Sequence, residues 1–188
     1  MPHLGRLLFS ITVAGWVLLE LSVRISESAR GRGHTGHDRF TRVLIGISIG
    51  VTIGVALGLS HTHSLRLPAA ARWAGLLVMW LGLATRLWAI VTLGKEFRTT
   101  VEVNPGQPVI SSGPYARVRH PSYTGLLLIV LGVGLASGSW VSLAICALVP
   151  LPALLLRIRV EEAELERVLG DSYVDYERRT KRLMPGVW

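Results

Sequence analysis

The chain has 188 residues, a formal net charge of +8 and a mean hydropathy of +0.46. Half of its residues are hydrophobic and 17% are charged, against roughly 25% charged residues in soluble domains. These values argue against a soluble basic domain that binds nucleic acid, and they predict an all-α integral membrane protein. The single cysteine, Cys146, excludes a disulfide framework and a cysteine metal site.

Five apolar runs are each close to the roughly 20 residues that a transmembrane helix needs. The predicted spans cover about residues 7–23, 43–60, 73–94, 121–137 and 139–156. The last two come from one uncharged stretch, and a single helix of that length would be nearly twice as long as a hydrocarbon core of roughly 30 Å. We therefore expect a fold-back at Ser137, Gly138 and Ser139. The sequence predicts one membrane domain that ends in a helical tail.

Basic residues alternate between the connecting segments. The segments after the first, third and fifth spans are rich in Arg and Lys, whereas the segment after the second has only Arg66 and Arg72. By the positive-inside rule, the N-terminus then lies outside and the tail lies in the cytoplasm. The composition, rich in Ala, Gly, Leu and Arg, is typical of bacteria, so we expect the bacterial inner membrane. The positive charge favours contact with anionic lipids.

The second span carries a stripe of small residues. Its glycines recur every four residues, at Gly46, Gly50, Gly54 and Gly58. Such a stripe lets another helix approach closely, and either an internal helix contact or a homodimer can use it. In the fifth span, Pro150 and Pro152 are expected to kink the helix and to free backbone groups there.

Two charged residues lie inside predicted spans. Glu20 is near the inner end of the first span, and Arg24 follows it by one helical turn, so we expect the two to pair along the helix surface. Arg86 lies deeper, roughly 12 Å from the end of the third span by helical rise. A guanidinium at that depth costs several kcal/mol unless it is paired or wetted. Arg86 is therefore a candidate pocket-lining residue.

Two pattern matches carry little weight. Residues 31–36 fit the dinucleotide fingerprint letter by letter, but they follow a membrane helix and no strand, so we attribute the match to chance. The histidine pairs, His34 with His37 and His61 with His63, lack further ligands nearby. The sequence therefore predicts no metal site.

The stretch from Gly113 to Gly125 is the first cluster of polar side chains. It contains Tyr115, Arg119, His120 and Tyr123, and it stands between two apolar runs, where the chain leaves and re-enters the membrane. Ionisable and aromatic groups concentrated at a membrane boundary favour a binding site for a polar ligand.

The tail contains the second cluster. One face of its predicted helix carries Ile158, Glu162, Leu165 and Leu169. Three of these are apolar, so Glu162 points where the helix should bury itself, next to Glu161. The two carboxylates either pair with Arg157 and Arg159 on an interfacial helix or enter a cytoplasmic pocket. Farther on, Tyr173, Tyr176, Arg179 and Arg182 suit either a membrane-interface belt or a lid over a polar molecule.

The two clusters together resemble a known family. The stretch from Gly113 to Gly125, then Glu161-Glu162 and the spaced tail residues up to Pro185, is similar to the isoprenylcysteine carboxyl methyltransferase family. It also resembles the wider group of membrane methyltransferases that includes phospholipid N-methyltransferases. The resemblance covers about residues 86–188, and the first two spans carry no motif. The chain departs from the family at Gln107, where His is common, and at Lys181, where Pro is usual.

The resemblance implies a multi-span enzyme that binds S-adenosylmethionine on the cytoplasmic side, in a pocket built from the C-terminal half. It also implies methylation of a lipophilic acceptor, such as an isoprenylcysteine-like carboxylate. The implied cofactor-binding residues are Gln107, Tyr115, Arg119, His120, Pro121, Tyr123, Glu161 and Tyr176. The implied catalytic residues are Arg86, Glu162 and Arg179, since guanidiniums can grip a carboxylate in bidentate fashion.

Three alternatives remain open at this point. The chain could be a phospholipid or amine N-methyltransferase, in which Glu161, Glu162 or His120 takes a proton from the acceptor. It could be a membrane reductase that takes a hydride from NADPH, although the chain is short for that class. It could also be a non-catalytic membrane protein on the same scaffold. Binding of S-adenosylhomocysteine, of NADPH or of neither separates these alternatives.

Overall fold

The computed structural model describes residues 3–29, 36–59, 65–97, 103, 106–184 and 186. His34, His61 and His63 lie outside these residues, as does most of the discounted stretch 31–36, and the side chain of His37 is not described. The helices are α1 (His3–Ala29), α2 (Gly36–Leu59), α3 (Ala69–Leu93), α4 (Pro121–Ser137), α5 (Trp140–Leu148), α6 (Pro150–Leu169) and α7 (Asp171–Arg179). Two short 3-10 turns, η1 (Gly94–Glu96) and η2 (Gly113–Ala116), lie between α3 and α4.

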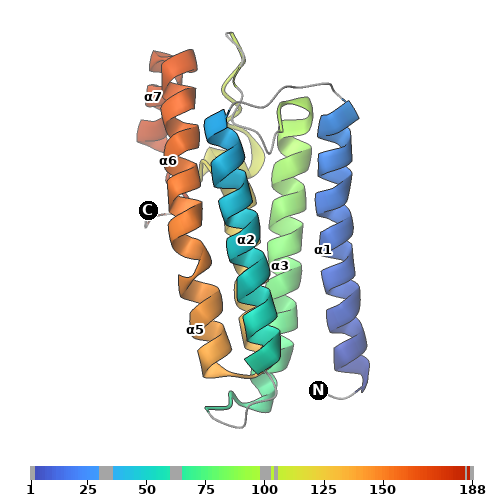
Figure 1. Ribbon diagram of the computed structural model, residues 1–188. Coiled ribbons are helices and arrows are strands. Elements are labelled where there is room, and N and C mark those ends of the chain that lie inside the picture. The colour runs from blue at the N-terminus through green and yellow to red at the C-terminus, as the bar shows by residue number, and fades with distance from the viewer. Residues whose placement is uncertain are drawn as a thin grey trace.

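The long helices stand side by side in one bundle, with α7 at the end opposite to the N-terminus (Figure 1). Within the described residues, four helical segments are long and apolar enough to cross a membrane: His3–Ser26, Phe40–Leu59, Ala69–Glu96 and Trp140–Leu169. The apolar α4 is shorter, at 17 residues. The prediction of an all-helical integral membrane protein is confirmed, and α5 and α6 together make the last predicted span.

Pro150 interrupts this last span. The helix breaks at Val149, and Pro150 begins α6, where its missing N–H is not needed. The carbonyl of Val149 accepts a hydrogen bond from the Ser48 hydroxyl of α2 at 3.3 Å. A polar side chain from a neighbouring helix thus satisfies a backbone group within a candidate membrane span, where lipid offers no hydrogen-bond partner.

The turn between α4 and α5 makes the expected fold-back. Gly138 has a φ of 77°, and its N–H donates to the carbonyl of Leu135 to close α4. A side chain is strained in this left-handed conformation, which explains the glycine. The same turn pairs with the segment before α3, because the N–H of Leu67 donates to the carbonyl of Gly138 at 2.9 Å.

Helices α3 and α4 pack backbone against backbone through glycines. A methyl group on Gly75 would lie 2.5 Å from the nitrogen of Ala136 and 2.7 Å from the carbonyl oxygen of Gly132. One on Gly82 would lie 2.7 Å from the carbonyl oxygen of Gly125. These distances are shorter than a Cβ tolerates, so the two helices can approach this closely only because the glycines lack side chains.

The glycine stripe of α2 has a different environment. A methyl group added at any of its four glycines would meet nothing within 4 Å among the described residues. The expectation of an internal helix contact at this stripe is therefore wrong for the described part of the chain. The homodimer alternative stays a prediction.

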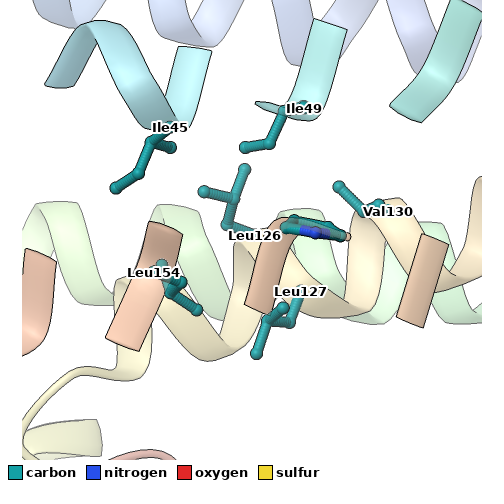
Figure 2. Close-up of a pocket in the computed structure, with 7 residues that line it drawn as sticks. Ile45, Ile49, Leu126, Leu127, Val130 and Leu154 are labelled. Atoms are coloured by element: carbon teal, nitrogen blue, oxygen red, sulfur yellow. The ribbon is translucent and has the colours of Figure 1, made fainter. Parts of the chain in front are cut away.

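The interior between α2, α4 and α6 is tightly filled. Ile45 and Ile49 of α2 face Leu126, Leu127 and Val130 of α4 and Leu154 of α6 (Figure 2), and the cavity between them measures about 10 Å³, or about one water molecule. This apolar core leaves no room for a ligand. A larger apolar groove, of about 500 Å³, lies between α1 and α2.

Candidate functional site

A backbone ladder joins the two polar clusters. The N–H of Arg119 donates to the carbonyl of Lys181 at 2.7 Å, and the N–H of His120 donates to the carbonyl of Arg182 at 3.0 Å. In return, the N–H of Lys181 donates to the carbonyl of Arg117 at 3.1 Å. The chain that follows α7 thus turns back and lies beside the start of α4.

Glu162 is at the centre of the joined clusters. Its Oε1 accepts from Nε of Arg119 at 2.8 Å and lies 3.1 Å from Nε2 of His120, and its Oε2 accepts from Nε of Arg182 at 2.7 Å. Only 4% of the Glu162 side chain is exposed. A buried carboxylate is stable only with partners of this kind. The prediction that Glu162 points inward from α6 is confirmed.

Arg119 ties this carboxylate to the end of α7. Its Nη1 donates to the carbonyls of Glu177 and Thr180 at 3.0 and 2.7 Å, and its Nη2 donates to Oε1 of Glu177 at 2.9 Å. The planar guanidinium therefore spans α6, α7 and the segment after it, a geometry that a lysine cannot copy.

Tyr123 connects the first turn of α4 to the neighbouring carboxylate of α6. Its hydroxyl donates to Oε2 of Glu161 at 2.7 Å and accepts from Nε of Arg157 at 3.2 Å. Its ring stacks on that of His120, with centroids 5.6 Å apart. Arg157 is buried and also donates to Oγ1 of Thr41 at 2.9 Å, so α2 supports the same network. Arg157, one of the two candidate partners of the acidic pair, is thus linked to Glu161 through the Tyr123 hydroxyl.

Three buried tyrosines lie close to these charged groups: Tyr115, Tyr173 and Tyr176. The Tyr176 hydroxyl donates to the carbonyl of Tyr115 at 2.8 Å, and burial raises the pKa of Tyr176 to about 12. The Tyr173 ring lies tilted against that of Tyr176, with centroids 5.9 Å apart. Tyr173 is 3% exposed, yet its hydroxyl oxygen has no hydrogen-bond partner among the described residues. Burial and then the nearby charge of Glu162 raise the pKa of Tyr173. Both hydroxyls are therefore protonated donors at neutral pH.

Arg86 lies on the membrane side of this site. Its Nη1 donates to the Ser122 carbonyl at 3.2 Å and to the Ser122 hydroxyl at 2.7 Å. Its Nε and Nη2 both donate to the carboxylate of Glu20 on α1. The prediction that Glu20 pairs with Arg24 is wrong, because both of its oxygens face Arg86 across the bundle.

The remaining predicted residues lie as follows. Pro121 is buried at the first position of α4, and Gln107 is half-buried in the segment that precedes η2. Arg179 is exposed at the end of α7, and its Nε donates to the carbonyl of Asp175. The structure does not bring Arg179 to Glu162, and Arg182 takes that place.

Sequence reasoning missed the contributions of Glu177, Thr180 and Glu20. Glu177 and Thr180 meet Arg119 mainly through backbone carbonyls, which leave no trace in a residue pattern. Glu20 had a visible signal, since a second charge within the spans, Arg86, needed a partner. Among the described residues no group of three or more His, Cys, Asp or Glu side chains could hold a metal ion.

The fold and the site together define a helical integral membrane protein with a charged, hydrogen-bonded site that joins the start of α4 to α6 and to the chain after α7. The family described as isoprenylcysteine carboxyl methyltransferase (ICMT) matches residues 74–167, half of the chain. The chain belongs to this family. The matched segment includes Arg86, Arg119, His120 and Glu162, whereas α1 and α2 lie outside it.

Several relatives resemble the chain over this half. Protein-S-isoprenylcysteine O-methyltransferase of Schizosaccharomyces pombe is 36% identical over 107 residues, which cover 56% of this chain and 45% of that protein. Protein-S-isoprenylcysteine O-methyltransferase B of Arabidopsis thaliana is 30% identical over 115 residues, covering 60% and 58%. The uncharacterised protein YpbQ of Bacillus subtilis is 30% identical over 95 residues, covering 46% and 56%. The chain spans about half the length of the curated relatives it matches.

A solved structure shares the arrangement of helices. The eukaryotic intramembrane Ras methyltransferase ICMT superposes with a TM-score of 0.58 and 25% sequence identity, covering 83% of this chain and 55% of that one. The similarity in structure thus extends over more of the chain than the family match does.

Proposed function

We propose that the chain is an S-adenosylmethionine-dependent methyltransferase that acts on a lipophilic acceptor, a carboxylate of the isoprenylcysteine type. Its family and the names of its relatives support methyl transfer. The basic residues that flank the spans support a bacterial inner membrane location with the site on the cytoplasmic side.

The observation that carries the proposal is the convergence on Glu162. The family segment supplies Arg119, His120 and Glu162, and the chain after α7 supplies Arg182 and closes over them. The result is a largely water-shielded cluster of alternating charges at the membrane boundary, fixed by backbone bonds. Such fixed dipoles and charges position a polar ligand without reorganising when it reacts.

The residues present fit S-adenosylmethionine. Its amino-acid end carries an ammonium and a carboxylate, and the site offers the half-buried carboxylate of Glu161 and the part-exposed guanidinium of Arg182, beside the buried pair of Arg119 and Glu162. The buried Tyr173 hydroxyl adds a donor with no partner within the described structure. A buried donor left unpaired costs about 1–3 kcal/mol, so a ligand or water that accepts from it stabilises the site.

The cofactor, when bound, supplies an activated methyl group on a sulfonium. The chain's part is to orient the acceptor and exclude water. A carboxylate acceptor is already anionic and needs no general base, in agreement with a site that lacks a Ser-His-Asp arrangement. Arg182 is best placed to orient that carboxylate, because it lies beside Glu162 and keeps 32% of its side chain exposed. Arg179, on the outside of α7, is proposed to attract the anion from solution.

The proposal is tested by ligand-dependent melting of the full chain in detergent. S-adenosylhomocysteine should raise the melting temperature by mass action, and labelled S-adenosylmethionine should transfer its methyl group to a lipid extract. Stabilisation by NADPH would favour a reductase, and stabilisation by neither compound would favour a non-catalytic protein. Transfer to amine headgroups alone would favour the N-methyltransferase branch, with Glu161 as the proton acceptor.

Two variants on the same helix sharpen this test. Glu161→Gln removes the charge that Tyr123 contacts, and it should weaken stabilisation by S-adenosylhomocysteine. Glu164→Gln is the matched control, because Glu164 pairs only with the exposed Arg167 among the described residues. Equal ligand responses in the two variants would remove Glu161 from the proposed cofactor site.

A further inference from the structure

The ion pair between Glu20 and Arg86 links a helix outside the family segment to the site. The two side chains meet with both carboxylate oxygens on Nε and Nη2 of the guanidinium. Arg86 has 7% of its side chain exposed and Glu20 has 25%. The Trp16 indole N–H, one turn earlier on α1, also donates to Glu20 at 3.0 Å. Glu20 is therefore held in place from both helices.

The remaining nitrogen of the same guanidinium, Nη1, binds the first turn of α4. Arg86 donates to both the carbonyl and the hydroxyl of Ser122 through Nη1. Ser122 stands between His120, which contacts Glu162, and Tyr123, which contacts Glu161. A shift of Arg86 therefore moves the helical turn that presents two side chains of the proposed cofactor site.

We propose that Glu20 is a positioning residue: through Arg86 and Ser122 it fixes the first turn of α4, and with it His120 and Tyr123, in the geometry that binds the cofactor. This inference rests on the proposed function. It makes α1 part of the working enzyme, although α1 lies outside the family segment.

The contacts favour positioning over direct binding of the acceptor by Arg86. Nε, Nη1 and Nη2 of Arg86 all donate to protein oxygens in this structure. An acceptor carboxylate would have to displace Glu20, which would then remain as an unpaired charge inside the membrane. With Glu20 neutralised instead, the guanidinium loses the partner that fixes its plane.

The test compares two neutralised charges on α1 in the full chain in detergent. Glu20→Gln should weaken S-adenosylhomocysteine binding by at least tenfold, since a displacement of about 1 Å can cost on the order of 100-fold at a catalytic site. Arg24→Gln, an exposed charge one turn away, should bind as the parent does. Glu20→Asp keeps the charge and should recover part of the affinity. If Glu20→Gln fails to fold, the same binding measurements are made on Glu20→Asp.

A purely structural anchor gives a different result. It would lower the melting temperature of Glu20→Gln while the affinity of the folded fraction stayed unchanged, and that result would overturn the proposal. A lower KM for the acceptor in Glu20→Gln would also overturn it, because Glu20 would then compete with the substrate. Combining Glu20→Gln with Ser122→Ala should weaken binding no more than the stronger single change, since both act through one guanidinium. Additive losses would contradict the coupling.

Hydrogen exchange separates this inference from the proposed function. The N–H groups of Tyr123 and Thr124 donate to the carbonyl of His120 at 3.0 and 3.1 Å and close the first turn of α4. In Glu20→Gln they should exchange faster than in the parent, and the acceleration should exceed that in the middle of α4. If the parent chain binds no S-adenosylhomocysteine, the proposed function fails, while this local acceleration still supports positioning by Glu20. Parent-like exchange rates of these two N–H groups in Glu20→Gln would overturn the proposal that Glu20 is a positioning residue.

Discussion

The glycines between α3 and α4 give a stability prediction with an internal control. Gly75→Ala places a methyl group 2.5 to 2.9 Å from three backbone atoms of α4, none of which can rotate away. Overpacking of this kind costs about 1–3 kcal/mol. Replacing Gly by Ala within a helix stabilises the folded state by about 0.5–1 kcal/mol, because Ala loses less backbone entropy on folding. With the middle value of each range, the net loss is about 1 kcal/mol, or roughly 2–4 °C in melting temperature for a chain of this size.

The assay is thermal unfolding of the purified protein in one detergent. The control is Gly54→Ala on α2, where the added methyl group meets nothing within 4 Å of the described chain. This variant should melt at the temperature of the parent or slightly above it, because only the helix propensity changes. Equal melting temperatures for Gly75→Ala and Gly54→Ala would refute the claim that backbone contact holds α3 and α4 together.

Three further predictions concern the site and the topology. Tyr173→Phe should raise the melting temperature of the ligand-free protein by removing a buried hydroxyl that has no partner among the described residues. It should also weaken S-adenosylhomocysteine binding. A lower melting temperature of this variant would mean that the hydroxyl has a partner. Arg119→Lys should abolish ligand stabilisation, because an ammonium cannot span Glu162 and the Thr180 carbonyl after α7. Arg178→Lys on the exposed face of α7 should behave as the parent in the same melting assay. A reporter fused at Gly138 should read outside the cytoplasm, and a cytoplasmic signal would contradict the orientation drawn from the basic residues.

The sequence predicted those features that depend on local periodicity. The inward position of Glu162 followed from its place among Ile158, Leu165 and Leu169, since a helix puts these residues on one face. The fold-back at Gly138 followed from the length of the uncharged stretch. Both depend on spacing within one element, which is why a single sequence was sufficient.

Contacts between distant elements were harder to predict. Glu20 has Arg24 one turn away, and local spacing alone cannot show that Arg86 on another helix is the better partner. The same difficulty affected the glycines. The regular stripe of α2 contacts nothing within 4 Å among the described residues, while Gly75 and Gly82 of α3 pack against α4. These two glycines are seven residues apart, which is the spacing of a helix–helix contact seam. Arg179 and Arg182 are three residues apart in the sequence, but α7 ends at Arg179. The extended backbone at Thr180 then turns Arg182 toward Glu162.

The backbone ladder beside α4 determines which substitutions the tail can accumulate. Main-chain groups make it, so the exposed side chain at Lys181 can change without breaking it, with proline as the exception. A proline at position 181 keeps the carbonyl that Arg119 uses but loses the N–H that donates to Arg117. That loss is worth about 0.5–1.5 kcal/mol. Lys181→Pro would therefore loosen the tail without detaching it, because the Arg119 and His120 N–H groups would keep their carbonyl partners.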